Sequence, residues 1–282
     1  DTSQHIELVR FSDGATLTYA DIVNQLGGGQ GQTITGTNGA NNLVGTNGAD
    51  TISALGGADT VNAGGGNDLV YGGDGADSIN GEAGDDHLFG DAGIDTIHGG
   101  LGADAIEGGN GNDFLYGEEG NDNVLGGAGA DYIDGGIGDD NLDGSVGADI
   151  IYGQEGDDQI YGNDGNDNVF VNDNTSALYA AANLQVNGGN GDDSITGHGL
   201  LSGDAGNDTL TGGTASQALN GGTGNDVLNG LGGVDTMDGG AGEDLFYVNF
   251  DAATDNFIGG ADYDTVLIVG TSGNDVVAGN QT

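Results

Sequence analysis

A single aliphatic residue recurs at every ninth position of the chain from Ile34 to Val169. Its two neighbours are mostly polar, and the six residues between successive triplets are rich in Gly and Asp. An apolar residue between polar ones has the alternation of a short strand with one buried face, and Gly-Asp runs favour tight turns. The pattern therefore predicts 16 strand-turn units of nine residues over 27–170. The aliphatic positions are Ile34, Leu43, Ile52, Val61, Val70, Ile79, Leu88, Ile97, Ile106, Leu115, Val124, Ile133, Leu142, Ile151, Ile160 and Val169.

Two such units make one coil of 18 residues, with a turn at each edge and a three-residue strand on each face. The aliphatic side chains of the two faces then meet in a thin core. Sixteen units predict eight coils, and a spacing of about 4.8 Å between coils gives a rod roughly 35–40 Å long. The predicted fold class is therefore all-β, an elongated parallel β-solenoid.

Four segments outside this first array depart from its pattern. Residues 1–26 alternate as far as Phe11 and pass a Ser-Asp-Gly turn into a stretch that fits either a strand or a short helix capped near Asp21, which predicts a cap or bridging segment. Residues 171–187 break the repeat phase and are predicted to be an insert. A second, degenerate array covers 188–247, and further units are scattered over an irregular segment, 248–282. Because the last residues look like the start of another unit, we expect a piece of a longer protein.

Composition narrows the chemistry. The chain has 46 acidic residues against one basic residue, Arg10, for a formal net charge of −45, and it has no Cys, Pro or Trp. Without Lys there is no P-loop and no Schiff-base lysine, and without Cys there is no disulfide framework or thiolate metal site. The absence of a basic patch argues against nucleic acid as a partner, and the absence of a long apolar run argues against direct membrane insertion. The expected partners are cations.

The turns suit one cation in particular. A typical unit reads GGNGNDFLY from Gly108, and the sixth position is Asp in 14 of the 16 units, from Asp50 to Asp167. Glycines with positive φ allow a tight turn whose backbone carbonyls point toward one centre, where the carboxylate joins them. A set of oxygen ligands favours Ca²⁺ over Zn²⁺, which prefers His and Cys. The sequence therefore predicts repeated calcium sites.

With these residues the chain resembles the RTX, or haemolysin-type, calcium-binding family, whose nonapeptide is G-G-x-G-x-D followed by a strand triplet. The resemblance implies a right-handed parallel β-roll, in which each Ca²⁺ lies between turns on the same edge and shares the sixth-position aspartates of units n and n + 2. It also implies type I secretion and folding outside the cell. Same-edge pairs within each array predict about 15 calcium ions. The predicted ligands are Asp50, Asp59, Asp68, Asp77, Asp86, Asp95, Asp104, Asp113, Asp122, Asp131, Asp140, Asp149, Asp158, Asp167, Asp193, Asp208, Asp226 and Asp244.

The second array is expected to be uneven. Its odd-numbered units carry aspartates at the sixth position, whereas the even-numbered units comprise a shortened unit at Gly197, a unit with Gln217 in place of Asp, and a unit with Asp235. Because alternate units lie on opposite edges, the sequence predicts calcium along one edge of 188–247 and an ion-poor opposite edge.

Several other interpretations fit the residues less well. In a calcium-free solenoid Asp would serve only to form turns, which does not account for its regularity at one position. A nine-residue period has no room for a 12-residue EF-hand loop. The four histidines lack metal-ligand spacing, and a row of outward Thr for binding ice is missing. No zinc-protease helix motif or nucleophile elbow occurs, so no catalytic residues are predicted and the chain is not expected to be an enzyme.

One outward row is apolar. On the face formed by even-numbered units, four successive coils at the end of the first array carry large apolar residues where the preceding coils are mostly polar. The row predicts an interaction surface for the insert, a second copy or a foreign ligand; the alternative is that aromatic residues simply suit strands and stack in ladders. The predicted interface residues are Phe114, Tyr116, Tyr132, Ile150, Tyr152 and Phe170.

Two functions remain. The first is a non-catalytic extracellular module, part of a surface-layer, matrix or adhesin-like protein, that folds on binding Ca²⁺. The second is the calcium-binding secretion module of a type I-exported enzyme or toxin whose catalytic domain lies outside this chain. The length of the arrays favours the first, with calcium ions as partners and self-association or a cell-surface or matrix partner left open. The sites are expected to be weak, roughly 10⁻⁴ to 10⁻³ M, as in other extracellular modules.

Overall fold

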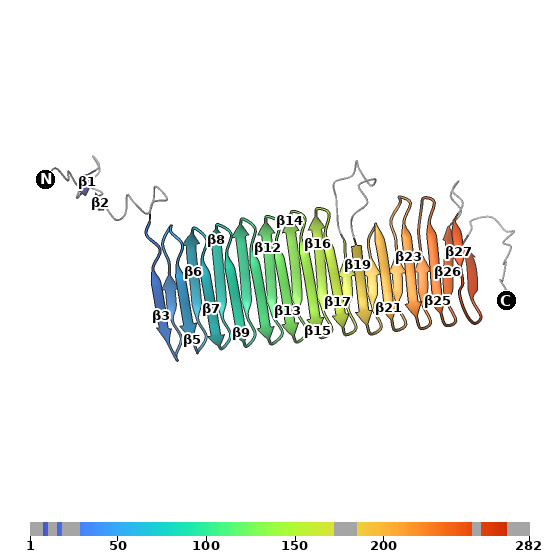
Figure 1. Ribbon diagram of the computed structural model, residues 1–282, viewed down its shortest axis with the longest axis horizontal. Helices are drawn as coiled ribbons and strands as arrows, with labels where there is room; N and C mark the ends of the chain where they lie inside the picture. The colour runs from blue at the N-terminus through green and yellow to red at the C-terminus, as the bar shows by residue number, and fades with distance from the viewer. Residues whose placement is uncertain (1–7, 11–15, 19–28, 172–184, 250–254, 270–282) are drawn as a thin grey trace.

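The computed structural model describes residues 8–10, 16–18, 29–171, 185–249 and 255–269 (Figure 1). From Thr33 onward the strands belong to two parallel sheets of 13 strands each, and successive strands alternate between the sheets. The described residues contain strands, turns and bends but no helix, so no described segment has the helical length and apolarity that a membrane crossing requires. The fold is an all-β parallel β-solenoid.

One sheet holds the odd-numbered strands: β3 (Thr33–Thr37), β5 (Thr51–Leu55), β7 (Leu69–Asp74), β9 (His87–Ala92), β11 (Ala105–Asn110), β13 (Asn123–Ala128), β15 (Asn141–Val146), β17 (Gln159–Asp164), β19 (Gln185–Asn190), β21 (Leu200–Ala205), β23 (Ala218–Thr223), β25 (Thr236–Ala241) and β27 (Asn256–Ile258). The other sheet holds the even-numbered strands: β4 (Asn42–Val44), β6 (Thr60–Gly65), β8 (Ser78–Ala83), β10 (Thr96–Leu101), β12 (Phe114–Glu119), β14 (Tyr132–Ile137), β16 (Ile150–Glu155), β18 (Asn168–Phe170), β20 (Ser194–Thr196), β22 (Thr209–Thr211), β24 (Val227–Asn229), β26 (Leu245–Asn249) and β28 (Thr265–Val269).

Strand register follows the repeat. Ile97 of β10 pairs with Ile79 of β8 on one side and with Leu115 of β12 on the other. Each strand therefore lies beside the strand two units away, which confirms two units per coil. The pairing also stacks aliphatic on aliphatic and keeps every unit in phase.

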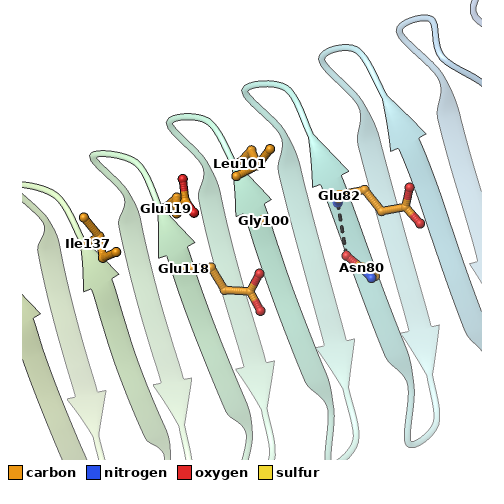
Figure 2. A pocket seen from close by; sticks show the side chains of 7 residues that line it. All are labelled: Asn80, Glu82, Gly100, Leu101, Glu118, Glu119 and Ile137. Atoms are coloured by element: carbon orange, nitrogen blue, oxygen red, sulfur yellow. Dashed lines mark hydrogen bonds between the residues drawn. The ribbon is translucent and has the colours of Figure 1, made fainter.

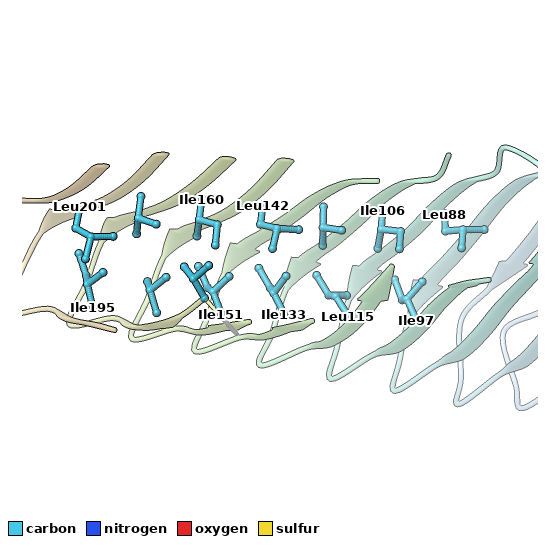
Figure 3. Packing of buried hydrophobic residues seen from close by; sticks show 14 of the residues in the cluster. Leu88, Ile97, Ile106, Leu115, Ile133, Leu142, Ile151, Ile160, Ile195 and Leu201 are labelled. Carbon is cyan, nitrogen blue, oxygen red and sulfur yellow. The ribbon is translucent and has the colours of Figure 1, made fainter. Parts of the chain in front are cut away.

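The core is a double row of these aliphatic side chains. Ile133, Leu142 and Ile151 are fully buried, and the rows from the two sheets face each other along the solenoid (Figure 3). The residues on either side of each aliphatic position point outward, as in β13 and β16, where an exposed and a half-buried residue flank the buried one. Burying one such side chain contributes about 1.5–3 kcal/mol, so a core one residue deep per strand is thin for a chain this acidic.

Most strands in the first array are longer than the three residues predicted. β12 runs on through Gly117 to Glu119, because the ladder continues into the following glycines: Gly100 pairs with Glu118 and Leu101 with Glu119. The second position has positive φ in most of the described units from Leu55 onward, as at Gly109 (φ 104°) and Glu118 (φ 76°). A turn was predicted there because glycine is common, but glycine also permits this bent continuation of a strand.

The insert is shorter than predicted. Gln185, Val186 and Asn187, placed in the insert by the sequence pattern, form the start of β19 and pair with Gln159, Ile160 and Tyr161 of β17. Val186 is 2% exposed and joins the core. These residues were missed because no G-G-x-G-x-D turn precedes them. The two sheets thus continue from one array to the next, with β17 pairing directly with β19 and β18 with β20.

The flanking segments are described in part. In the predicted cap, β1 (Leu8–Arg10) and β2 (Thr16–Thr18) form an antiparallel pair, and the turn between them and the region around Asp21 lie outside the described residues. In the segment predicted to be irregular, β27 and β28 extend the same two sheets. The unit predicted at Gly270 lies outside the described residues.

Candidate metal centre

The sixth-position aspartates form two buried ladders, one at each edge of the solenoid. The members from Asp50 to Asp244 are at most 3% exposed. The backbone N–H of each aspartate donates to Oδ1 of the aspartate in the next coil, as from Asp104 to Asp122 (2.8 Å) and from Asp122 to Asp140 (2.8 Å). Each of these carboxylates is therefore held in place by a backbone N–H of the preceding coil.

The second oxygen of these carboxylates has no such partner. A buried carboxylate oxygen that is left without a hydrogen bond carries a large desolvation cost, which a cation in contact with it offsets. The buried Oδ2 atoms without a hydrogen-bond partner among the described residues include those of Asp59, Asp68, Asp77, Asp86, Asp95, Asp104, Asp113, Asp122, Asp131, Asp140, Asp149, Asp167, Asp193, Asp208, Asp226 and Asp244.

Backbone oxygens converge on the same places. A Cβ built on Gly108, the first residue of its unit, would lie 2.6 Å from Oδ2 of Asp113 and 2.7 Å from the carbonyl oxygen of Gly126 in the next coil. A Cβ built on Gly126 meets Asp131 Oδ2 and the next carbonyl oxygen at 2.7 Å each. The missing side chain leaves a cradle of carboxylate and carbonyl oxygens, which is the donor set that Ca²⁺ prefers.

The donor set does not depend on clustered side chains. Within the described ranges, no three His, Cys, Asp or Glu side chains gather closely enough to hold a metal by themselves. A cation in the cradle would therefore take many of its ligands from backbone carbonyls. This fits the predicted chemistry, and the residues present fit calcium.

Burial raises the pKa of these carboxyl groups while no cation is bound. Desolvation raises the pKa of Asp86, Asp140 and Asp149 to about 7, although a backbone hydrogen bond to each opposes the shift and neighbouring aspartates add to it. The same causes raise the pKa of Asp68 and Asp131 to about 6. Near neutral pH, the metal-free ladders thus tend to retain protons that a cation would displace.

All 18 predicted aspartates lie in the ladders, and the ladders extend beyond them. The N–H of Asp167 donates to Asp193 Oδ1 (2.7 Å), which joins the two arrays along one edge. The sequence count omitted this pair because it treated the arrays separately. It also omitted Asp255 and Asp264, which accept from Asp235 N–H (3.0 Å) and Asp244 N–H (3.2 Å). Asp264 could have been found from the sequence, because it is the sixth residue of the unit that begins at Gly259.

Asp50 differs from the other predicted ligands. Its Oδ2 accepts from the N–H of Thr46 (2.5 Å) and from the Thr46 hydroxyl (3.1 Å), within its own turn. Asn41 closes the preceding turn in the same way, its Oδ1 accepting from Thr37 N–H (2.6 Å). Both turns have Thr at the second position of the unit, where no later unit of the first array has it. The first turns therefore satisfy their own side chains.

The ladder at the other edge is interrupted in the second array. Gln217 occupies an aspartate position: its N–H donates to Asp235 Oδ1 (3.0 Å), and its Oε1 accepts from Gly213 N–H (2.9 Å). Its Nε2 is buried and has no hydrogen-bond partner among the described residues. In the preceding coil, Gly199 occupies the corresponding position of the ladder, and its carbonyl oxygen accepts from Ala218 N–H (3.3 Å). The side chains along this edge match the predicted uneven array; its calcium content stays a prediction.

A second ladder, which the sequence analysis missed, lies outside the first. Fifth-position Asn and Asp side chains accept from the next coil, as from Asp139 N–H to Asn121 Oδ1 (3.1 Å) and from Asp157 N–H to Asp139 Oδ1 (2.9 Å). These residues are exposed. The recurring N-D and D-D pairs in the sequence were the available signal, and they reflect stacking between turns.

The predicted interface residues do lie together on the even-numbered sheet. Ring centroids are 5.7 Å apart for Tyr116 and Tyr132, 5.5 Å for Tyr132 and Tyr152, and 4.9 Å for Tyr152 and Phe170. Phe114 lies 6.1 Å from Tyr132 and is 45% exposed. The rings cover much of one another, as in a simple ladder. Whether the row binds a partner stays a prediction.

Comparisons with known proteins address the repeat itself. The chain matches the family model for the RTX calcium-binding nonapeptide repeat over residues 35–70, 63–97, 98–133, 134–169, 185–199, 200–216, 211–246 and 267–281. Among curated proteins there is no match.

Two solved structures are similar. One is the extracellular lipase LipA from Serratia marcescens, at 25% identity and a TM-score of 0.25; the match covers 64% of this chain and 38% of the lipase chain. The other is a hyperactive, Ca²⁺-dependent, β-helical antifreeze protein from an Antarctic bacterium, at 19% identity and a TM-score of 0.32, covering 78% of this chain and 85% of that one. This chain thus spans little more than a third of the lipase that it matches.

Proposed function

Because the chain belongs to the RTX calcium-binding nonapeptide repeat family, we propose that it is a structural module that folds on binding Ca²⁺ outside the cell. The observation that carries the proposal is the row of buried, unpaired Oδ2 atoms at each edge. A folded, calcium-free chain at neutral pH would either ionise these carboxyls in a buried place or hold protons on them. Calcium removes both costs.

We assign the ligands as the 18 predicted aspartates together with Asp235, Asp255 and Asp264. Each ion would lie between same-edge neighbours and be completed by backbone carbonyls of the two turns. The arrays alone predict about 15 sites. Three more sites come from the pairs Asp167–Asp193, Asp235–Asp255 and Asp244–Asp264. This number of ions would cancel most of the formal charge of −45.

The chain's own residues provide the scaffold. The aliphatic rows align the coils, the Asp N–H to Oδ1 bonds hold the carboxylates in place, and the glycines leave room for the carbonyls to approach. Metal binding and folding are then one process, because the turns of two coils must be stacked before a site exists. With sites of roughly 10⁻⁴ to 10⁻³ M, the module would fold in extracellular fluid and stay unfolded in cytosol.

The proposal is tested by measuring calcium-dependent folding and the number of bound ions on the same protein. Far-UV circular dichroism in EGTA and then in millimolar Ca²⁺ should show β structure only with calcium, and elemental analysis of the gel-filtered protein should count the ions. Asp122→Asn, within a ladder, should raise the calcium concentration at the midpoint of folding. Asp157→Asn removes a charge from an exposed position and is the matched control. An unchanged β signal in EGTA would refute the proposal.

The same module could serve a structural protein or accompany an exported enzyme. We favour a role in a surface-layer, matrix or adhesin-like protein, because the repeats in both sheets continue to β28 without any other kind of domain among the described residues. The full-length protein decides between the two: repeats throughout support the structural role, and a catalytic domain beside the repeats supports the secretion module.

A further inference from the structure

Two hollows lie on the sheet faces, away from the ladders. One surrounds Gly100 on the even-numbered sheet and is walled by the carboxylates of Glu82, Glu118 and Glu119 (Figure 2). Glu118 already contacts His98 Nδ1 (2.8 Å). The other is a groove across β17, β19, β21, β23 and β25 on the odd-numbered sheet, with a volume of about 450 Å³. The two hollows differ sharply in charge.

Strand register explains the shape of the groove. Its ninth-position row runs Tyr161, Asn187, Ser202, Asn220 and Asp238, and each residue pairs with the next across neighbouring strands. Small side chains at Ser202 and Ala218 lower the middle of the groove, so that core residues such as Leu219 reach its floor. Five strands at about 4.8 Å spacing make the groove roughly 19 Å long, parallel to the solenoid axis.

The groove is nearly neutral in a chain of net charge −45. Asp238 is the one carboxylate in its lining, whereas Gln185, Asn187 and Asn220 offer carboxamides and Tyr161, Ser202 and Thr236 offer hydroxyls. Leu200, 52% exposed, adds an apolar contact. The groove therefore combines hydrogen-bonding groups of both kinds with apolar surface.

Internal hydrogen bonds orient these groups and use part of their capacity. Asn187 Nδ2 and Ser202 Oγ both donate to the carboxylate of Asp204, which lies beside the groove (2.7 and 2.6 Å), and Asn220 Nδ2 donates to Ser202 Oγ (3.4 Å). Within the described residues, nothing donates to the amide oxygens of Asn187 and Asn220. Tyr161 is half-buried and lines the groove, and its ring stacks on no other described ring, unlike the rings of the aromatic row on the opposite sheet.

We propose that this groove binds a neutral glycan chain lying along the solenoid axis. Hydroxyl groups of a sugar match the carboxamides and hydroxyls, and the apolar face of a sugar ring matches Tyr161 and Leu200. An anionic polymer would be repelled by the acidic rod, and a basic protein would be drawn to the acidic turns and to the hollow at Gly100 instead. A glycan repeats along its length as the groove repeats from coil to coil.

The groove requires stacked coils, so the inference rests on the proposed calcium-dependent fold. Circular dichroism of every sample, with calcium and with EGTA, reports that fold separately from binding. The calcium-saturated chain is titrated with dextran, laminarin, galactomannan and xyloglucan, with hyaluronan as the anionic comparison. Calorimetry measures affinity, and saturation-transfer NMR detects weak binding of the matching oligosaccharides.

We expect at least one neutral polymer to bind and hyaluronan not to bind. Tyr161→Ser should weaken binding about tenfold by removing the ring contact, and Asn220→Asp should also weaken it. Tyr71→Ser, at the same repeat position of β7 on the same sheet but outside the groove, should leave the affinity unchanged. Failure of every neutral polymer to bind, preference for hyaluronan, or an equal loss in Tyr71→Ser would overturn the inference.

Discussion

Restoring an aspartate at Gln217 should add a calcium site to the interrupted edge. Gln217 is 7% exposed, its Oε1 lies beside Gly212 where other units have an aspartate Oδ2, and its buried Nε2 has no hydrogen-bond partner among the described residues. Such an unsatisfied buried group costs about 1–3 kcal/mol. The remainder of the cradle is present, since a Cβ built on Gly212 would lie 2.9 Å from the carbonyl oxygen of Gly230. In Gln217→Asp the new carboxylate would face Asp235, one coil along the same edge.

The expected gain follows from mass action. With a dissociation constant of 10⁻⁴ to 10⁻³ M, an added site should contribute about 1.4–2.7 kcal/mol at 10 mM Ca²⁺. For a repeat region of this size, that corresponds to roughly 3–10 °C in Tm. The gain should fall as the calcium concentration is lowered, because the new buried charge is offset only while an ion is bound.

Gln217→Asn is the matched control, because its side chain has the same shape as Asp but ends in an amide. Thermal unfolding followed by circular dichroism, at low and at high millimolar calcium, compares the two variants, and elemental analysis should count one more ion in Gln217→Asp. Ala215 stands where regular units have Gly, so the double variant Ala215→Gly/Gln217→Asp tests the site in a regular turn. If Asp and Asn variants gain equally from calcium in both backgrounds, the assignment of the ladders as ligands is wrong.

Three further predictions use the same structure. Because burial raises the pKa of Asp86, Asp140 and Asp149 to about 7 from an unfolded value near 3.8, the metal-free fold gains stability as pH falls through 7 and loses it as pH rises; the β signal in EGTA should therefore be larger at pH 5.5 than at pH 7.5, and an equal signal at the two pH values would contradict the pKa shifts. Gly129→Ala should destabilise the calcium-bound roll by roughly 2–5 kcal/mol in urea unfolding, because its φ is 149° and its Cβ would overlap the Gly111 carbonyl, whereas Gly39→Ala, at the same unit position with open space around it, should have little effect. Replacing Tyr116, Tyr132 and Tyr152 with Ser should reduce self-association in sedimentation at saturating calcium if the aromatic row is an interface, and unchanged sedimentation and folding would leave it a stacking ladder.

Local spacing was enough to predict the repeat, the two units per coil and the aspartate positions. Each nonapeptide contains its own turn glycines, its carboxylate and its core residue, so the information is local and is repeated until chance no longer accounts for it. Ile133 and Asp131 can be assigned to core and edge from a single unit. The insert boundary could not, because Val186 is recognised as a core residue only through its pairing with Ile160, 26 residues earlier.

The residues alone were therefore enough to predict the fold class, 18 members of the buried ladders and the kind of cation that suits them. The contacts between coils could be seen only in the folded chain: one ladder passes unbroken from Asp167 to Asp193, Gln217 has a buried amide nitrogen without a described partner on the other edge, and Ser202 and Ala218 open a groove lined by a single carboxylate. The reason is physical. Turn and strand preferences act within nine residues, whereas these features arise from side chains brought side by side by strand register, at sequence separations that vary with each irregular unit.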